Sequence, residues 1–406
     1  MVTAAVIAEF NPPHNGHAYL AEQIRKKFGE DTRILALMSG NFVQRADVAI
    51  VDKYTRAEMA ISMGYNAVLE LPFPYSCASA RDFADAAVEI LDNLGSIDYL
   101  CFGSENPDLT TFCKIAEYLL SEEFAFHIDS LREDPSTSDQ SYIQLTTTLI
   151  QKQFGEAIAK EFTLPNNILS ISYIVALKKR DSVIQPISFQ RLGSYHSEEL
   201  GDTIASASAI RKCINEGNIE EARPYVNDTI YRKLVEKFEA GVLPSNISRL
   251  YSSIVIEILK SEKYGLKQLP AECDQSLLSR IYSAAHEAKD FPSLVSMIKA
   301  KHYTDAHIRR ALIYTYIFTT REWLNQPPLY TTLLAADRKG RWLLKAIKKT
   351  RKIPVLTKVA DYSTIFNGDA RLQAQFTTWS DMIYLQSLPN PQPAAKALRI
   401  SPYIHD

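Results

Sequence analysis

Two histidines set three residues apart, His14 and His17, carry the clearest chemical signal in the sequence. They lie in the segment FNPPHNGH at residues 10–17, directly after a short apolar run. Imidazoles at this spacing at a helix start can face one ligand, and the helix N-terminus adds free N–H groups and a partial positive charge. Gly16 lets the backbone approach a phosphate closely. The segment predicts a site for an anion that gains charge during a reaction; a solvated helix cap is the alternative.

The same residues are a poor metal site, because no carboxylate or third histidine lies at helical spacing from the pair. The five cysteines are scattered and form no Cys-x-x-Cys pair. We therefore expect neither a zinc site nor a disulfide framework, and no bound metal is predicted from these residues.

A second segment, ASASAIRK at residues 205–212, combines hydroxyl and basic side chains at a predicted helix start. Ser206 and Ser208 can cap the helix, and Arg211 and Lys212, one turn on, can hold phosphate oxygens. Taken alone, the segment is better explained as an ordinary serine-capped helix with solvated basic residues. Its occurrence together with the histidine segment is what indicates phosphate binding.

Lys53 and Arg56 lie one turn apart on a further predicted helix, residues 53–63. They could bind pyrophosphate oxygens or an RNA phosphate, and a solvated basic helix face is the alternative. Both interpretations expose the two charges to solvent or to a ligand.

The elements that must position these residues alternate through the first half of the chain. Short apolar runs that predict strands occupy residues 2–10, 33–38, 67–71, 98–102 and 183–190. Helical patterns lie between them, which indicates βαβ units, and the near-continuous apolar character of the runs fits a sheet covered on both faces. The predicted fold class is α/β, a doubly wound, Rossmann-like parallel sheet with a mainly α-helical C-terminal domain.

The charge of the chain is divided unevenly between its halves. Residues 1–225 hold 19 Lys and Arg against 31 Asp and Glu, whereas residues 226–406 hold 26 against 16. The alternation of strand and helix ceases after about residue 225, so we predict a catalytic domain at 1–225 and a helical, basic domain at 226–406. Such an asymmetry suggests that the second half meets a polyanion, unless its basic helices simply dock on the acidic half.

The histidine segment after the first strand and the serine-rich helix start after the last strand together resemble the nucleotidylyltransferase superfamily. The resemblance implies in-line attack on the α-phosphate of ATP with release of pyrophosphate. Sites of this kind act by positioning and charge stabilisation and need no protein nucleophile.

The first half also resembles the bacterial tRNA(Met) cytidine acetate ligases, through a series of ordered blocks. The blocks are VIAEFNPPHNGHAY at 6–19, MSGNFVQR at 38–45, DKYTRAEMA at 52–60, LELPF at 69–73, FGSE at 102–105, PNNIL at 165–169 and ASASAIRK at 205–212. The resemblance implies that acetate and ATP give acetyl-adenylate, whose acetyl group moves to N4 of the wobble cytidine of elongator tRNA(Met). The sequence departs from the family at Ala46-Asp47-Val48, where Gly-Glu-Pro is usual, and at Pro13, where a Phe is expected.

Carried over by this resemblance, the catalytic residues are His14, His17, Ser208 and Arg211, with Ser206 and Lys212 helping to hold the triphosphate. The implied ATP-binding residues are Val6, Ile7, Ala8, Glu9, Phe10, Asn11, Pro12, Pro13, His14, Asn15, Gly16, His17, Ala18, Tyr19, Gly103, Asn167, Arg191 and Leu192. Gly103 ends a predicted strand, where nucleotides bind at the carboxyl edge of a parallel sheet. Asn167 could bond a ribose or base edge or merely cap the next helix. Arg191 could meet a phosphate, stack on adenine or remain a solvated loop residue.

The densest basic stretch, residues 338–358, contains no acidic residue. If it is helical, one face carries Arg338, Arg341, Lys345, Lys348 and Lys352. Trp342 could pack inward or stack on a base. A second cluster comprises Lys299, Lys301, His302, His307, Arg309 and Arg310. Solvated helices would explain such charges, but beside a resemblance to a tRNA ligase they favour contact with a phosphate backbone.

The predicted partners are ATP, acetate and elongator tRNA(Met), and no protein partner is implied. Mg²⁺ is expected to accompany ATP, although no carboxylate cluster in the sequence marks a site for it. No run of about 18 apolar residues suggests a membrane span, and no basic leader with a cleavage site occurs, so a cytoplasmic protein is expected. Two alternatives are a small-molecule adenylyltransferase acting on a phosphate monoester and a non-catalytic RNA-binding module.

Overall fold

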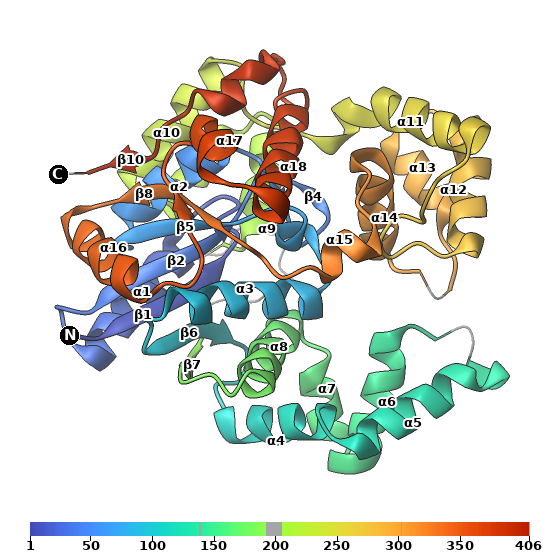
Figure 1. Ribbon diagram of the computed structural model, residues 1–406, viewed down its shortest axis with the longest axis horizontal. Helices are drawn as coiled ribbons and strands as arrows, with labels where there is room; N and C mark the ends of the chain where they lie inside the picture. Colours follow the sequence, from blue (N-terminus) through green and yellow to red (C-terminus); the bar gives the residue numbers. More distant parts are fainter. Residues whose placement is uncertain (138–139, 192–204, 302, 406) are drawn as a thin grey trace.

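A twisted, mostly parallel sheet forms the centre of the computed structural model, which describes residues 1–137, 140–191, 205–301 and 303–405. Its strands follow the order β10-β8-β5-β2-β1-β6-β7, with β9 beside β8. The five strands of the first half are all parallel: β1 (Thr3–Ala8), β2 (Arg33–Ser39), β5 (Ala67–Leu71), β6 (Tyr99–Ser104) and β7 (Gln185–Gln190). The α/β fold class and these five strands are confirmed (Figure 1).

Helices cover both faces of the sheet because successive side chains of the strands point to opposite sides. In β1, Ala4 and Val6 belong to one apolar core, whereas Ala5 and Ile7 belong to the other. The first core includes residues of α1 (Asn15–Phe28), α2 (Lys53–Ser62), α9 (Ala207–Asn215) and α10 (Asp228–Glu239). The second includes residues of α3 (Ala80–Leu94), α8 (Pro165–Lys179) and α16 (Arg338–Thr350).

The C-terminal half adds three strands to the same sheet. β8 (Thr331–Ala336) pairs antiparallel with β5, and β9 (Val355–Leu356) and β10 (Tyr403–Ile404) pair parallel with β8. The expectation that the alternation of strand and helix ceases after about residue 225 is therefore wrong, because β8, α16 and β9 follow one another. The division at 225/226 stays a prediction about folding units, and the sheet itself crosses it.

Two groups of helices extend beyond the sheet on the right of Figure 1. The lower group, between β6 and α8, comprises α4 (Leu109–Leu119), α5 (Glu122–Glu133), α6 (Tyr142–Phe154) and α7 (Glu156–Phe162). The upper group comprises α11 (Tyr251–Tyr264), α12 (Gln275–Glu287), α13 (Phe291–Ile298), α14 (Asp305–Ile317) and α15 (Arg321–Asn325). The remaining elements are β3 (Phe42–Val43), β4 (Asp47–Val48), α17 (Tyr362–Ile365) and α18 (Gly368–Tyr384).

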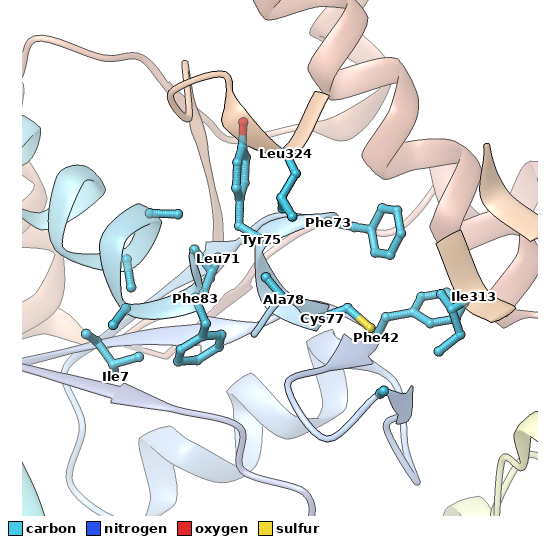
Figure 2. Packing of buried hydrophobic residues seen from close by; sticks show 14 of the residues in the cluster. Ile7, Phe42, Leu71, Phe73, Tyr75, Cys77, Ala78, Phe83, Ile313 and Leu324 are labelled. Carbon is cyan, nitrogen blue, oxygen red and sulfur yellow. The ribbon is translucent and has the colours of Figure 1, made fainter. Parts of the chain in front are cut away.

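The segment after β5 joins the upper helices to the sheet. Figure 2 shows Phe73 and Cys77 of this segment packed with Phe42, Ile313 and Leu324 in one apolar core. Burial of this many apolar side chains holds the upper helices on the sheet. Within the described ranges, no helix is long and apolar enough to cross a membrane.

Candidate active site

The paired histidines lie where β1 turns into α1. His14 caps the helix: its Nδ1 accepts the Gly16 N–H at 3.0 Å, and His17 Nδ1 accepts the His14 N–H at 3.2 Å. Their ring centroids are 4.0 Å apart, so the prediction that both imidazoles share one side of the helix start is confirmed. A neutral imidazole whose Nδ1 accepts must carry its proton on Nε2. Each histidine therefore keeps one N–H donor for a ligand.

Burial keeps both imidazoles uncharged. It is the largest cause that lowers the pKa of His14 to about 3, with the Arg191 and Arg211 charges adding to it. Burial likewise holds the pKa of His17 well below its ordinary value, helped by His14 and Arg191. At neutral pH the pair offers dipolar donors rather than cations, and a bound anion can recruit them without breaking an existing ion pair.

The structure gives a reason for a glycine at position 16 that the sequence did not reveal. A Cβ at this position would lie 2.8 Å from Cε1 of His14. The glycine thus leaves room for the histidine ring that caps its own helix. Close approach of a phosphate to Gly16 stays a prediction.

The serine-rich segment converges on the histidine loop, as predicted. Ser206 caps α9 by accepting the Ala209 N–H at 3.1 Å. Arg211 donates to the carbonyl of Asn11 at 2.7 Å and to Oγ of Ser208 at 3.0 Å. One guanidinium therefore ties together two segments about 200 residues apart in sequence. Phosphate binding by this group stays a prediction, and Lys212 is exposed outside the cavity described next.

A cavity of about 420 Å³ opens between these two segments. The predicted residues that line it are Val6, Ile7, Ala8, Glu9, Phe10, Asn11, His14, Gly16, His17, Tyr19, Gly103, Arg191, Ser206, Ser208 and Arg211. The predicted residues Pro12, Pro13, Asn15, Ala18 and Asn167 are not among the lining residues. Leu192 lies outside the described residues.

The cavity also has walls that sequence reasoning missed. Ser79, Phe83 and Tyr173 line it from α3, its cap and α8, and Thr304 and Arg310 line it from the upper helices. Only the fold brings these residues to the carboxyl edge of the sheet, so no local pattern could have identified them. Arg45 is a partial exception, because it lies in a family-like block; it donates to Ser208 Oγ at 3.4 Å.

Gly103 and Arg191 are linked through their packing. The Arg191 N–H bonds the Ser104 carbonyl at 3.0 Å, and a Cβ on Gly103 would lie 2.8 Å from Cγ of Arg191. The Arg191 guanidinium donates to Oδ1 of Asn166 at 2.8 Å. The missing side chain at Gly103 thus allows Arg191 to fold over β6 toward the cavity.

Asn167 is fully buried, and its amide has partners within the chain. Its Oδ1 accepts the Glu105 N–H at 3.1 Å and its Nδ2 donates to the Glu161 carbonyl at 3.0 Å. These bonds fix the start of α8 against the loop after β6. Its neighbour Asn166 is the one that lines the cavity, while hydrogen bonding of a nucleotide by Asn167 stays a prediction.

Both interpretations of Lys53 and Arg56 are wrong, because the two side chains are buried structural groups. Nζ of Lys53 lies 2.6 Å from Oε1 of Glu70 and 2.6 Å from Oδ2 of Asp381, with the three side chains at most 6% exposed. Arg56 is 0% exposed and donates to the carbonyls of Val51, Glu9 and Gly40. Buried charges with these partners hold the chain together and leave no group for an external phosphate.

The basic helix α16 lies at the opposite edge of the sheet from the cavity. Its cap Asp337 accepts from Asn66, just before β5, and Thr350 at its end donates to the Leu94 carbonyl, shortly before β6. Figure 1 shows α16 near the N-terminus, away from the upper helices. The histidine loop instead follows the carboxyl end of β1. Any RNA held by α16 must therefore reach the cavity from the far edge.

The charges of α16 are accessible, as predicted. Arg338, Lys345 and Lys348 are exposed and Arg341 is half-buried; Lys352 is exposed too, but it lies beyond the end of the helix and not on its predicted face. Trp342 is 47% exposed beneath the Arg338 guanidinium, so inward packing of this ring is wrong.

The second basic cluster is largely bound within the chain. Nε2 of His307 lies 2.6 Å from the Glu272 carbonyl, Arg309 pairs with Asp47 and Arg310 pairs with Glu272. Lys299 pairs with Asp305, and His302 lies outside the described residues. These contacts fasten α14 to its neighbours and to β4.

The chain matches one family of known proteins along almost its whole length. The model of the HIGH Nucleotidyl Transferase family matches residues 1–397. The tRNA(Met) cytidine acetate ligase of Caldanaerobacter subterraneus subsp. tengcongensis is 37% identical over 368 residues, 90% of each chain. That of Acetivibrio thermocellus is 32% identical over 403 residues, 96% of each chain.

Among solved structures, apo Thermotoga maritima TmcAL (form I) covers 100% of both chains with a TM-score of 0.91 at 24% identity. Thermotoga maritima TmcAL bound with alpha-thio ATP also covers 100% of both chains, with a TM-score of 0.88 at 25% identity.

Proposed function

Because this chain belongs to the HIGH nucleotidyl transferase family and, within it, to the tRNA(Met) cytidine acetate ligases, we propose that it activates acetate with ATP as acetyl-adenylate. It then acetylates N4 of the wobble cytidine in elongator tRNA(Met). The relatives are named tRNA(Met) cytidine acetate ligase, and a solved relative with the same fold is bound with alpha-thio ATP.

One observation supports the activation step above all others: two neutral histidines and Arg211 converge on one cavity from the two ends of the first 225 residues. The Nε2–H groups of His14 and His17 would donate to phosphate oxygens that gain charge as the acetate oxygen attacks the α-phosphate. Donors already fixed by helix-capping bonds need little reorganisation during the reaction. Ser206, Ser208 and Arg211 would hold the departing pyrophosphate on the α9 side.

Mg²⁺ would enter with the nucleotide and screen the charge of the triphosphate. In the described part of the chain, no group of three or more His, Cys, Asp or Glu side chains could hold a metal. We therefore infer that Mg²⁺ is bound mainly by phosphate oxygens and water, and we assign it no protein site.

The test is exchange of labelled pyrophosphate into ATP. Exchange that depends on added acetate supports activation as acetyl-adenylate, and exchange indifferent to acetate contradicts it and favours a small-molecule adenylyltransferase. Incubation with labelled acetate, ATP and total tRNA, followed by nucleoside analysis, must then yield N4-acetylcytidine in elongator tRNA(Met). ATP binding without either reaction would indicate a non-catalytic RNA-binding module.

A further inference from the structure

One lining residue of the cavity differs from all the others in charge. The described lining residues include Arg45, Arg191, Arg211 and Arg310 on the basic side, and Glu9 is the one acidic residue among them. A carboxylate beside a nucleotide triphosphate repels it. A carboxylate in this cavity is therefore better suited to a step other than triphosphate binding.

The backbone of Glu9 is held by the buried core. Glu9 directly follows β1, and its carbonyl accepts a 2.5 Å hydrogen bond from the buried guanidinium of Arg56. Phe10, the next residue, turns away with a positive φ of 48°. The position of Glu9 is therefore determined by the core and does not depend on a ligand.

The Glu9 charge acts on residues of the core that lies opposite the histidines. Continued by one residue past Ala8, the alternation of β1 puts Glu9 on the side of Ile7, which lies beside Phe83 in Figure 2. The Glu9 charge adds to burial in raising the pKa of Tyr173, a residue of that same core. Phe10, on the other face, packs against the ring of His17 at 4.9 Å. The cavity thus has a phosphate side and a second side, and Glu9 is on the second.

The Glu9 carboxylate is also uncommitted. In the described residues, no hydrogen bond or ion pair engages its side chain, whereas its backbone is tightly held. The side chain is half-buried. A half-buried carboxylate that accepts no bond from the protein is available to accept one from a substrate.

From these placements, and resting on the proposed function, we propose that the Glu9 carboxylate accepts a hydrogen bond from the N4 amine of the target cytidine. During acetyl transfer the same carboxylate takes a proton from that amine. Carboxylates accept hydrogen bonds from the N4 amino group of cytosine. This amine must enter the cavity for acetyl transfer, the second reaction, because it is the group that attacks acetyl-adenylate. The histidines serve the phosphate side and Glu9 serves the acceptor side.

The N4 nitrogen forms a bond to the carbonyl carbon of acetyl-adenylate, and the bond from that carbon to the phosphate oxygen of AMP breaks with its electron pair leaving on AMP. One of the two amine protons passes to the Glu9 carboxylate and from there to water. The products are N4-acetylcytidine and AMP, and no oxidant or further reactant is needed.

The experiment compares Glu9→Gln with the wild-type full chain in two assays. Acetate-dependent exchange of pyrophosphate into ATP, and trapping of acetyl-adenylate by hydroxylamine as acetyl hydroxamate, should fall far less than tRNA acetylation, because neither needs the cytidine. Acetylation of tRNA in a single turnover should fall about 100-fold or more, the range for loss of a general base. Glu9→Asp, which keeps the carboxylate one methylene back, should recover part of the transfer rate.

Two results would overturn the assignment. Wild-type tRNA acetylation by Glu9→Gln would show that the carboxylate is not used, and loss of exchange together with transfer would place Glu9 in ATP or Mg²⁺ binding. Failure of the proposed function is distinguishable, because the wild type itself would then lack acetate-dependent exchange. Exchange that Glu9→Gln retains also shows that the variant is folded.

Discussion

Two pairs of residues in this chain look alike in sequence and behave in opposite ways. His14 with His17, and Lys53 with Arg56, are each three residues apart near the start of a helix, α1 and α2 respectively. The histidines face a cavity with free Nε2 donors, whereas Lys53 and Arg56 are enclosed by carboxylates and carbonyls. Helical spacing tells which side chains share a face, but long-range partners decide whether that face is a site or part of the core.

The largest effect on activity should come from removing the imidazole N–H donors of the two histidines that face the cavity. His14→Ala combined with His17→Ala should lower acetate-dependent exchange about 1000-fold or more, about 4 kcal/mol of transition-state stabilisation. Loss of the helix cap should lower the free energy of unfolding by only about 0.5–2 kcal/mol. Exchange kinetics and denaturation measure the two quantities separately.

Asn15→Ala is the matched control in the same loop, because the Asn15 side chain bonds the Pro224 carbonyl and does not line the cavity. Any part that Asn15 has in ATP binding then comes from its backbone, which the substitution keeps. It should keep exchange within about threefold of wild type. Equal loss in the control and in the double histidine variant would mean that the loop acts as a whole, without a specific contribution from the imidazoles.

On the core side, Lys53→Met should act on stability. It leaves Glu70 and Asp381 facing each other without their shared cation, and breaking such a buried group costs about 3–5 kcal/mol. Urea denaturation should show the loss, while exchange per folded molecule should change little. The triple variant Lys53→Met, Glu70→Gln, Asp381→Asn removes all three charges and should regain part of the stability. An unchanged free energy of unfolding in Lys53→Met contradicts the structural role.

A third comparison uses pH. Burial lowers the pKa of His14 to about 3 in the folded chain, so between pH 6.5 and pH 3 the unfolded chain binds a proton that the folded chain does not. Stability must therefore fall as pH drops below 6.5. From pH 7 to pH 5 the wild type should lose about 2 kcal/mol more unfolding free energy than His14→Gln. Parallel pH dependence in the two proteins would mean that His14 titrates normally.

Sequence reasoning succeeded where the information is local. Short patterns predict the strands of the first half, the start of α1 and the capping by Ser206. The histidine segment and the serine-rich segment also meet as predicted. β8 was missed because Thr331–Ala336 reads TTLLAA, in which Leu and Ala are good helix formers, although Pro327 and Pro328 shortly before it mark a turn. Its place in the sheet comes from pairing with β5.

The errors on the site side have a different origin. Lys53 is neutralised by Asp381, which lies 328 residues further along the chain, and Arg310 and Thr304 reach the cavity from α14 and its cap. No window of sequence contains both members of such a contact.

The smallest effect should come from α16, where basic residues are exposed and not enclosed like Lys53. Lys345→Gln, Lys348→Gln and Lys352→Gln together should leave exchange and the free energy of unfolding within about 0.5 kcal/mol of wild type. If this face holds the tRNA backbone, KM for tRNA should rise roughly 3- to 10-fold at moderate salt. The dependence of binding on salt should weaken by about one counterion per lost contact.

The matched control neutralises Lys260, Lys263 and Lys267, which are also exposed in and beside α11. A similar rise in the control would reduce the effect to net charge, and no rise in either variant would remove α16, at the far edge of the sheet, from the tRNA-binding surface.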